Sequence, residues 1–252
     1  MGRLGIQLYT VKDEAEKDYF GTIRKLAEMG YEGIEFHGGT MAKSPARELK
    51  IFLDDLKFEL IGLVFGKDEL ENQLDKVLQY CKDCKCTVVL FPWIDEKCRT
   101  AEGYKEFAEK FNFWGRKFKE NGIQLLYHTH GYEFENLNGK TGMEILMENT
   151  DPEYFNLEID VYWVEWGGVD AVQFMKKYGN RSPYIHFKDM RDRETKHDVE
   201  VGDGCIDMLS IARIGKENNA EWFIVEQEEF DMPSLKSAEI SLKNLKRIVK
   251  EM

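Results

Sequence analysis

Short apolar runs alternate with longer amphipathic segments along the whole chain. The short runs are rich in β-branched and aromatic residues and predict eight strands. These strands cover residues 4–10, 31–37, 58–65, 86–93, 123–130, 155–163, 183–190 and 221–229. Between them, apolar residues recur at helical spacing. One such segment carries an aromatic stripe, ends at Gly122, and predicts a helix packed on the strands: Phe107, Phe111, Trp114 and Phe118.

The regular strand–helix alternation predicts an α/β protein with a single (β/α)₈ barrel spanning residues 1–252. Right-handed crossovers make all strands of such a barrel parallel. No linker rich in Pro, Gly or Ser divides the chain, which contains only five prolines, so one domain is expected. A doubly wound parallel sheet is the structural alternative.

Composition narrows the range of partners and compartments. The chain carries 47 acidic and 35 basic residues, a formal charge of −12, which argues against nucleic acid as the main partner. No apolar run approaches the roughly 20 residues that cross a bilayer, and the first residues lack the features of a signal peptide. We therefore expect a cytoplasmic protein whose five cysteines are free thiols in a reducing compartment.

Polar residues gather where the predicted strands finish, which is where (β/α)₈ barrels place their catalytic groups. Side chains two positions apart share a strand face, and a charge inside an apolar strand is costly unless it is paired or bound to a metal. Taken singly, each of these strand-end residues could have a structural role. Glu35 and His37, for example, could contact substrate or form a local ion pair. The strand-end residues are Glu35, His37, His128, His130, Glu158, Asp160, His186, Lys188, Asp189, Glu226 and Glu228.

Several motifs together resemble the sugar phosphate isomerase/epimerase family, within the xylose-isomerase-like TIM-barrel superfamily. They are GIQLYTVKD, YHTHGYEFE, LEIDVYWV, IHFKDM, EVGDGCID and IVEQEE, and they extend over essentially the whole chain. The resemblance implies a metal-dependent barrel acting on a small sugar, keto-sugar or inositol derivative. Family members often form dimers or larger assemblies, so a homo-oligomer remains open.

The resemblance also implies a set of metal ligands. Asp160, His186 and Glu226 match the family's ligands on strands 6, 7 and 8, and His128 stands where strand 5 commonly carries Glu. Imidazole with carboxylates suits Mn²⁺, Zn²⁺, Co²⁺ or Fe²⁺. A second departure is Trp163, which replaces a His found in many epimerases. In many epimerases of the superfamily, one Glu removes a proton from the substrate and another Glu returns a proton on the opposite face. Both departures disagree with that scheme.

The main hypothesis is an isomerase or epimerase that removes a proton next to a carbonyl through a metal-stabilised enediolate. Glu226 is the first candidate for the base and His130 the second. Lys188 would protonate or hydrogen-bond the enediolate oxygen, and Glu158 would hold a ligand or Lys188 in place. Glu35, His37 and Trp163 are the candidate substrate contacts.

Other functions remain as alternatives. A lyase or dehydratase acting on a keto-sugar, keto-glycoside or inosose would use the same metal site but expel a β-substituent, which needs one base rather than a symmetric pair. Endonuclease-like hydrolysis would need more histidines and a basic groove than this acidic chain offers. A sugar-binding protein without catalysis would keep the aromatic residues and lack metal dependence. No GxGxxG dinucleotide motif occurs.

Overall fold

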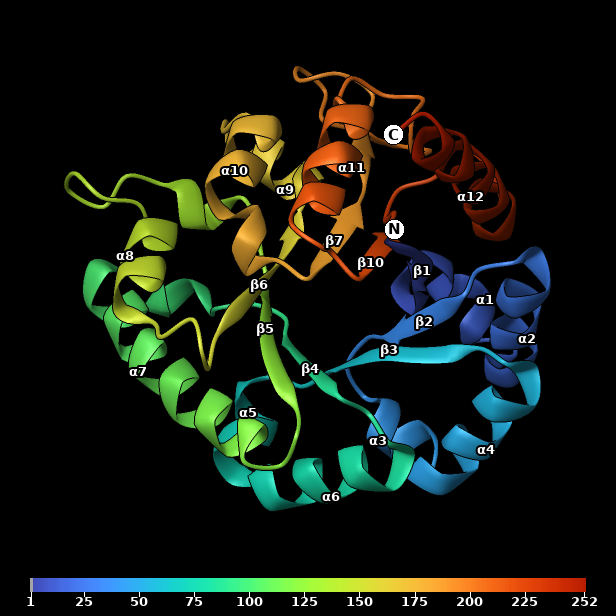
Figure 1. Ribbon diagram of the computed structural model, residues 1–252, viewed down its shortest axis with the longest axis horizontal. Helices are drawn as coiled ribbons and strands as arrows, with labels where there is room; N and C mark the ends of the chain where they lie inside the picture. The colour runs from blue at the N-terminus through green and yellow to red at the C-terminus, as the bar shows by residue number, and fades with distance from the viewer. Residues whose placement is uncertain (1) are drawn as a thin grey trace.

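Eight parallel strands close into a barrel in the computed structural model, which describes residues 2–252 (Figure 1). Their order around the ring is β1-β10-β7-β6-β5-β4-β3-β2. The barrel strands are β1 (Arg3–Gln7), β2 (Gly33–Phe36), β3 (Glu59–Val64), β4 (Val88–Phe91), β5 (Gln124–His128), β6 (Asn156–Asp160), β7 (Tyr184–Phe187) and β10 (Trp222–Val225). The predicted (β/α)₈ barrel is confirmed.

Helices surround the strands on the outside, as Figure 1 shows. The α-helices are α1 (Lys12–Ala15), α2 (Tyr19–Met29), α3 (Thr40–Lys43), α4 (Ala46–Leu56), α5 (Lys67–Asn72), α6 (Leu74–Cys84), α7 (Ala101–Lys119), α8 (Gly142–Asn149), α9 (Val161–Trp166), α10 (Ala171–Tyr178), α11 (Met208–Glu217) and α12 (Ser234–Lys250). Short 3₁₀ turns are η1 (Leu8–Val11), η2 (Glu96–Cys98), η3 (Tyr132–Phe134) and η4 (Gly179–Arg181). In the described part of the chain, no helix is long and apolar enough to cross a membrane.

The predicted aromatic stripe of α7 packs against the barrel. Phe107, Phe111, Trp114 and Phe118 are all buried, and Phe111 stacks on Phe155 with ring centroids 4.8 Å apart. Thr100 caps the helix by accepting a hydrogen bond from the backbone of Gly103. The chain then turns through Gly122, which has a φ of +72°.

The barrel interior is filled below the strand ends. Its apolar layer consists of Ile61, Val88, Leu90, Leu126, Tyr184, Trp222 and Ile224. Gly33 makes room for this layer, because a Cβ atom there would lie 2.7 Å from the Trp222 ring. The barrel interior is therefore a packed core, with the Arg3–Glu59 pair at the amino end of the strands and the candidate site residues at the carboxyl end.

All eight predicted strands end earlier than the apolar pattern suggested; the eighth stops at Val225, so Glu226 and Glu228 follow β10 instead of lying in it. The first stops at Gln7 and continues as η1, and the sixth stops at Asp160 and continues as α9. Asp160 causes the second change, because its Oδ1 accepts hydrogen bonds from the backbone of Tyr162 and Trp163 and caps α9. Trp163 therefore lies on a helix rather than at a strand end.

The seventh predicted strand, residues 183–190, is divided in the structure. Only β7 (Tyr184–Phe187) joins the barrel, and β8 (Asp189–Met190) forms an antiparallel hairpin with β9 (Asp198–Val199). Asp189 holds the loop beyond this hairpin, since its carboxylate accepts hydrogen bonds from the backbone of Gly202, Gly204 and Ile206. Asp189 is therefore a structural residue.

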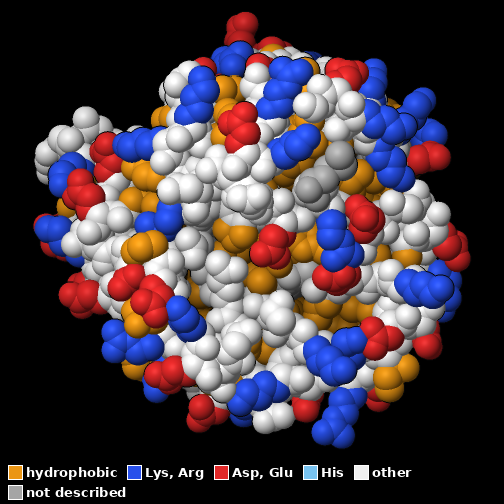
Figure 2. All heavy atoms as spheres, viewed as in Figure 1, with side chains coloured by type: hydrophobic (Ala, Val, Ile, Leu, Met, Phe, Trp, Pro, Cys, Tyr) orange, Lys and Arg blue, Asp and Glu red, His pale blue; other side chains and the backbone are white. Residues whose placement is uncertain are grey.

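Charged side chains of both signs are interspersed over the face in Figure 2, most of them toward its edge and a few near its centre among hydrophobic and uncharged atoms. All five cysteines are free, and Cys81, Cys84 and Cys86 are buried. The acidic excess is thus spread over the surface rather than gathered in one patch on the visible face.

Candidate active site

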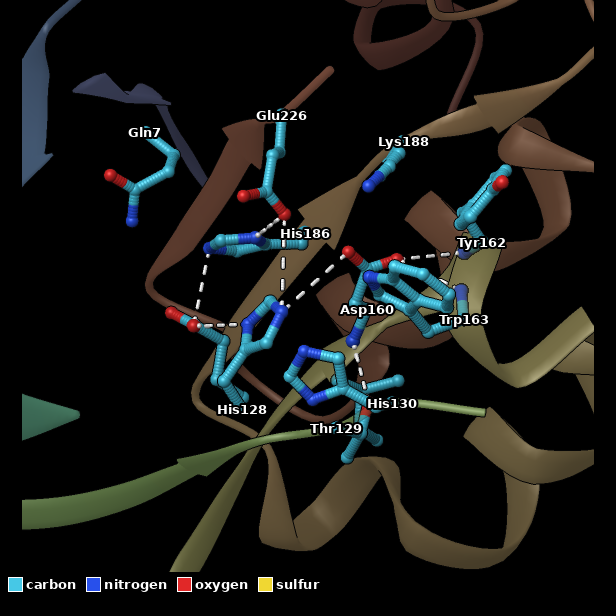
Figure 3. Close-up of polar contacts among 12 residues, drawn as sticks. Gln7, His128, Thr129, His130, Asp160, Tyr162, Trp163, His186, Lys188 and Glu226 are labelled. Atoms are coloured by element: carbon cyan, nitrogen blue, oxygen red, sulfur yellow. Dashed lines mark hydrogen bonds and ion pairs between the residues drawn. The ribbon is translucent and has the colours of Figure 1, made fainter. Parts of the chain in front are cut away.

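Four side chains from neighbouring strands point toward one another at the carboxyl end of the barrel (Figure 3). They are His128, Asp160, His186 and Glu226, and one potential ligand atom from each lies within 4.8 Å of all the others. Nε2 of His128 lies 3.9 Å from Oδ2 of Asp160 and 3.9 Å from Oε2 of Glu226. Nδ1 of His186 lies 3.1 Å from the same Glu226 oxygen.

The barrel order explains this convergence. Strands β5, β6, β7 and β10 are consecutive in the ring, and the register places Asp160 directly beside His186. Because parallel strands finish at the same end of the barrel, residues far apart in the chain reach one point.

The donor set fits a divalent cation. Oδ2 of Asp160 is buried and has no hydrogen-bond partner among the residues that the structure describes. The two 3.9 Å separations at His128 Nε2 are too long for hydrogen bonds. Two atoms that each bind one metal ion at about 2.0–2.2 Å lie about 3–4 Å apart, so the spacing suits a shared cation.

Glu158 lies behind both imidazole rings. Its Oε2 is 2.9 Å from Nδ1 of His128 and 3.2 Å from Nε2 of His186. In each ring this is the nitrogen that does not face the other ligands. Carboxylates in this position orient metal-binding histidines and select their tautomers.

Glu35 is also fully buried beside His186. Its Oε1 lies 3.3 Å from Nε2 of His186 and accepts a short hydrogen bond from the amide of Gln7. Among the described residues, no ion pair joins Glu35 to His37. The sequence allowed Glu35 and His37 either to contact substrate or to form an ion pair with each other, and that ion pair is absent from the described part of the chain.

Burial changes the acid–base behaviour of the groups at the centre. It lowers the pKa of His128 to about 4 and the pKa of His130 well below its ordinary value. It raises the pKa of Glu35 to about 8, assisted by the nearby Glu158 carboxylate. It also raises the pKa of Asp160 well above its usual range. Removing these groups from water disfavours their charged forms, and a bound cation would reverse this for the carboxylates.

For three further groups, neighbouring charges outweigh burial in setting the direction of the pKa shift. Burial opposes the charge of Glu226, but the Lys188 ammonium and His186 hold the pKa of this carboxyl well below its usual range. Burial likewise opposes the charge of Lys188, yet the surrounding carboxylates, first Glu226 and then Asp160, raise its pKa. The pKa of His186 is raised against the effect of burial by Glu158 and Glu35.

Lys188 is enclosed by charged and aromatic groups. Its Nζ donates a 2.6 Å hydrogen bond to Glu228 and lies 3.8 Å from Asp198. The same atom lies 4.7 Å and 4.8 Å from the ring centroids of Tyr162 and Trp163. The ammonium group is therefore fixed in position at the edge of the centre (Figure 3).

His130 follows the end of β5 and is held by two aromatic rings. Its imidazole stacks on Tyr132 at 5.3 Å with an interplanar angle of 12° and contacts Trp163 at 5.4 Å. The carboxylate of Glu133 accepts a hydrogen bond from the His130 backbone. Nδ1 of His130 is buried and has no hydrogen-bond partner. The ring is therefore a positioned, uncharged imidazole next to His128.

Comparison with known proteins places this geometry in a family. The family model described as xylose isomerase-like TIM barrel matches residues 23–248. This chain belongs to the xylose isomerase-like TIM barrel family. The resemblance read from the sequence motifs is thereby confirmed.

Curated relatives of this xylose isomerase-like barrel are named inosose dehydratase. The protein of Clostridium tetani is 32% identical over 255 residues, covering 85% of this chain and 84% of that protein. The protein of Clostridium perfringens is 32% identical over 165 residues, a match that spans only 54% of its length.

Solved structures share the fold. A sugar phosphate isomerase/epimerase from Parabacteroides distasonis has a TM-score of 0.84 at 21% identity, with 98% of each chain covered. The probable 3-DHS dehydratase AsbF from Bacillus anthracis has a TM-score of 0.77 at 13% identity, covering 97% of this chain and 98% of that one. The IOLI protein with a bound zinc atom has a TM-score of 0.79 at 13% identity, covering 99% and 98%.

A cavity of about 870 Å³ opens above the centre of this xylose isomerase-like barrel. The three residues predicted to contact substrate, Glu35, His37 and Trp163, all line it. Trp93 and Trp166 line it as well and are 57% and 41% exposed. Lys188 is not among the lining residues.

Sequence reasoning missed three residues of the site. Gln7 ends β1 and could have been found, because it is one more polar residue at a strand end. Arg99 lies in a loop and Tyr132 begins the short 3₁₀ turn η3, and no periodic pattern marks either residue. Only the folded chain brings these two residues to the cavity.

Proposed function

We propose that this protein is a divalent-metal-dependent dehydratase that eliminates water from a cyclic polyhydroxylated ketone of the inosose type. The observation that carries the proposal is the convergence of His128, Asp160, His186 and Glu226 beside the uncharged imidazole of His130. The inosose dehydratase of Clostridium tetani, which matches over 85% of this chain, supports dehydration over the isomerase reading that the motifs put first.

His128, Asp160, His186 and Glu226 would hold the metal. The bound zinc in the structurally similar IOLI protein supports this assignment. Two imidazoles and two carboxylates suit Mn²⁺, Co²⁺, Zn²⁺ or Fe²⁺. When bound, the ion would act as a Lewis acid on the substrate carbonyl and so acidify the neighbouring C–H bond.

His130 is the base that the geometry favours. Its ring is uncharged, its Nδ1 has no partner, and its position is fixed by Tyr132 and Trp163. Glu226, the first candidate from the sequence, instead has Oε2 within 3.1 Å of His186 and 3.9 Å of His128. We therefore assign Glu226 to the ligand set and His130 to proton transfer.

One base suffices for the elimination. His130 takes the proton from the carbon next to the carbonyl, and the electron pair of that C–H bond forms the new C=C bond. The hydroxyl on the β-carbon leaves with its bonding electrons and receives the proton carried by His130, so that enone and water are the products. Lys188, whose pKa is raised by its carboxylate neighbours, would stabilise developing negative charge without giving up its proton.

The remaining predicted roles concern positioning and binding. Glu158 would orient both ligand histidines through the contacts at 2.9 Å and 3.2 Å. Glu35, His37 and Trp163 would contact the substrate hydroxyls and ring, because all three line the cavity.

Isomerisation or epimerisation is the second candidate function. It shares the first proton transfer with dehydration but differs in the second step, because the proton returns to carbon and no substituent leaves. Glu228, which accepts a hydrogen bond from Lys188, also lines the cavity, and it would supply the further proton-transfer group that this alternative requires.

The test is incubation of the manganese-loaded protein with a panel of inososes and keto-sugars in deuterated water, followed by mass spectrometry. Dehydration predicts a product lighter by one water molecule, and His130→Ala should lose this product while His197→Ala, a histidine outside the centre, should retain it. Deuterium uptake without loss of water would favour the isomerase alternative. No loss of water and no deuterium uptake for any ketone would refute both.

A further inference from the structure

Arg99 is the single Lys or Arg among the residues that line the active-site cavity. Six carboxylates share that lining: Glu35, Glu69, Glu135, Glu158, Glu226 and Glu228. Within residues 2–252, no carboxylate lies within ion-pair distance of Arg99. Other arginines of the described chain, such as Arg24 and Arg116, also form no ion pair, so what sets Arg99 apart is its place in the cavity wall.

The Arg99 side chain is held in place by a small set of contacts. Its Nε donates a 2.9 Å hydrogen bond to the carbonyl of Ile94, and its Cζ lies 3.5 Å from the ring centroid of Tyr132. The Tyr132 hydroxyl in turn accepts a hydrogen bond from the backbone of Ile94 at 2.8 Å. The guanidinium plane is therefore fixed on the phenol ring before any ligand arrives.

These contacts use only one of the three guanidinium nitrogens. Among the described residues, neither terminal nitrogen of Arg99 has a hydrogen-bond partner. Two arginines that are held by their surroundings differ: Arg181 uses Nε on Asn156 and a terminal nitrogen on the carbonyl of Phe155, and Arg193 pairs with Glu165. A purely structural role for Arg99 would leave this donor capacity unexplained.

The neighbouring carboxylates are occupied elsewhere. Glu69 accepts a hydrogen bond from the backbone of Gly66, and Glu228 accepts one from Lys188. Glu35, Glu158 and Glu226 surround the ligand histidines, and Glu135 is exposed. Arg99 lies on the far side of Tyr132 from this group, because Tyr132 stacks on both Arg99 and His130.

We propose that Arg99 binds an oxyanion group, a carboxylate or a phosphate, on the substrate. Two free N–H groups in a fixed plane match the two oxygens of such a group. The cavity of about 870 Å³ lies in the upper part of the range for ligand pockets and has room for a substituent beyond one six-membered ring. This inference rests on the proposed dehydratase function for the position of the reacting ring, and it changes the expected substrate from a neutral to an anionic cyclic ketone.

The test compares three unreactive cyclohexane polyols on the manganese-loaded protein by calorimetric titration. They are neutral myo-inositol, the carboxylate quinate and myo-inositol 1-phosphate. At least one anion should bind more tightly than myo-inositol. Arg99→Gln should weaken that anion about tenfold or more and change myo-inositol binding less than twofold. The anion that loses affinity identifies the source, carboxylate or phosphate.

Two further variants separate recognition from structure. Arg193→Gln removes another guanidinium and should leave all three affinities unchanged, and Arg99→Lys keeps the charge without the planar fork and should lose part of the anion affinity. Metal content and melting temperature report whether each variant folds. Equal weakening of all three ligands in Arg99→Gln, or no preference of the wild type for either anion, would overturn the inference.

The outcome does not depend on turnover, because none of the three ligands is a ketone. If a neutral inosose is dehydrated but Arg99→Gln binds both anions as tightly as the wild type does, the dehydratase proposal stands and the role of Arg99 fails. If anions bind through Arg99 but no ketone is dehydrated, the role of Arg99 stands and the dehydratase proposal fails.

Discussion

Oε2 of Glu158 lies 2.9 Å from Nδ1 of His128, on the edge of the imidazole ring that faces away from Asp160 and Glu226. This contact favours the tautomer with a proton on Nδ1, which leaves the lone pair of Nε2 directed at the other ligands. The same carboxylate oxygen lies 3.2 Å from Nε2 of His186. One buried side chain thus orients two of the four candidate ligands.

Glu158→Gln should weaken metal binding about 10- to 100-fold while the protein still folds. A glutamine amide keeps the shape but carries no negative charge, so it stabilises the tautomer of His128 with a proton on Nδ1 less and no longer attracts His186. Manganese titration of chelator-treated protein measures the change. Glu148→Gln, an exposed residue of α8 paired with Lys140, is the control, and equal affinities for the two variants would contradict the role of Glu158.

Asp160 has two functions that two substitutions separate. Asp160→Asn keeps an oxygen for the backbone of Tyr162 and Trp163 but replaces the oxygen that faces the other ligands. Asp160→Ala loses both. Both variants should lose bound metal. In the presence of chelator, the free energy of unfolding of Asp160→Ala should be about 1 kcal/mol lower than that of Asp160→Asn. Denaturant unfolding measures the difference, and identical curves would show that the helix cap contributes nothing.

Metal binding should stabilise the fold. At a free Mn²⁺ concentration one hundred times the dissociation constant, linkage predicts about 2.7 kcal/mol. For a chain of this size, that corresponds to a rise of roughly 5–10 °C in melting temperature. Manganese is preferred to zinc here, because zinc also binds cysteines in the unfolded state. Calorimetry with and without chelator provides the measurement, and His186→Ala should abolish the shift; a shift that survives in this variant would place the metal elsewhere.

Glu133 should give stability a pH dependence of known sign. Burial raises the pKa of this carboxyl to about 7, above the ordinary value of 4.5. Between these two pH values the unfolded chain loses the proton that the folded chain retains, so stability falls as pH rises from about 4.5 to 7 and is level above it. The whole contribution is at most about 3 kcal/mol.

Glu133→Gln should remove that slope. An amide can still bond to the Tyr127 hydroxyl and the His130 backbone, the two partners of Glu133, and it does not titrate. As pH rises from about 4.5 to 7, the wild type should therefore lose stability through this group and Glu133→Gln should not. Denaturant unfolding at several pH values tests this, with exposed Glu153→Gln as control. Parallel pH curves for wild type and Glu133→Gln would rule the effect out.

The barrel and its four candidate ligands could be predicted from the sequence for a physical reason. Apolar runs indicate where each strand ends, and a charged residue there is costly without a partner, which marked the polar strand-end residues. The resemblance to the family then singled out His128, Asp160, His186 and Glu226 among them. Because all eight strands end together, their convergence followed from the fold.

The remainder depended on contacts that no local pattern encodes. Trp163 reads as the end of a strand, yet the carboxylate of Asp160 three residues earlier starts a helix there. The β8–β9 hairpin pairs two residues with two, too few for periodicity to show. Arg99 reaches the cavity from a loop through Ile94 and Tyr132, and its unpaired state is a property of the folded surroundings alone.

Closure of the ring by β10 has a consequence for how the protein is made. This strand lies between β1 and β7 and precedes only the last helix, α12. While the ribosome is still adding these residues, β1 and β7 present open edges, and the emerging chain carries three of the four ligands. Closing the barrel and adding the fourth candidate ligand, Glu226, therefore depend on the same late segment of the chain.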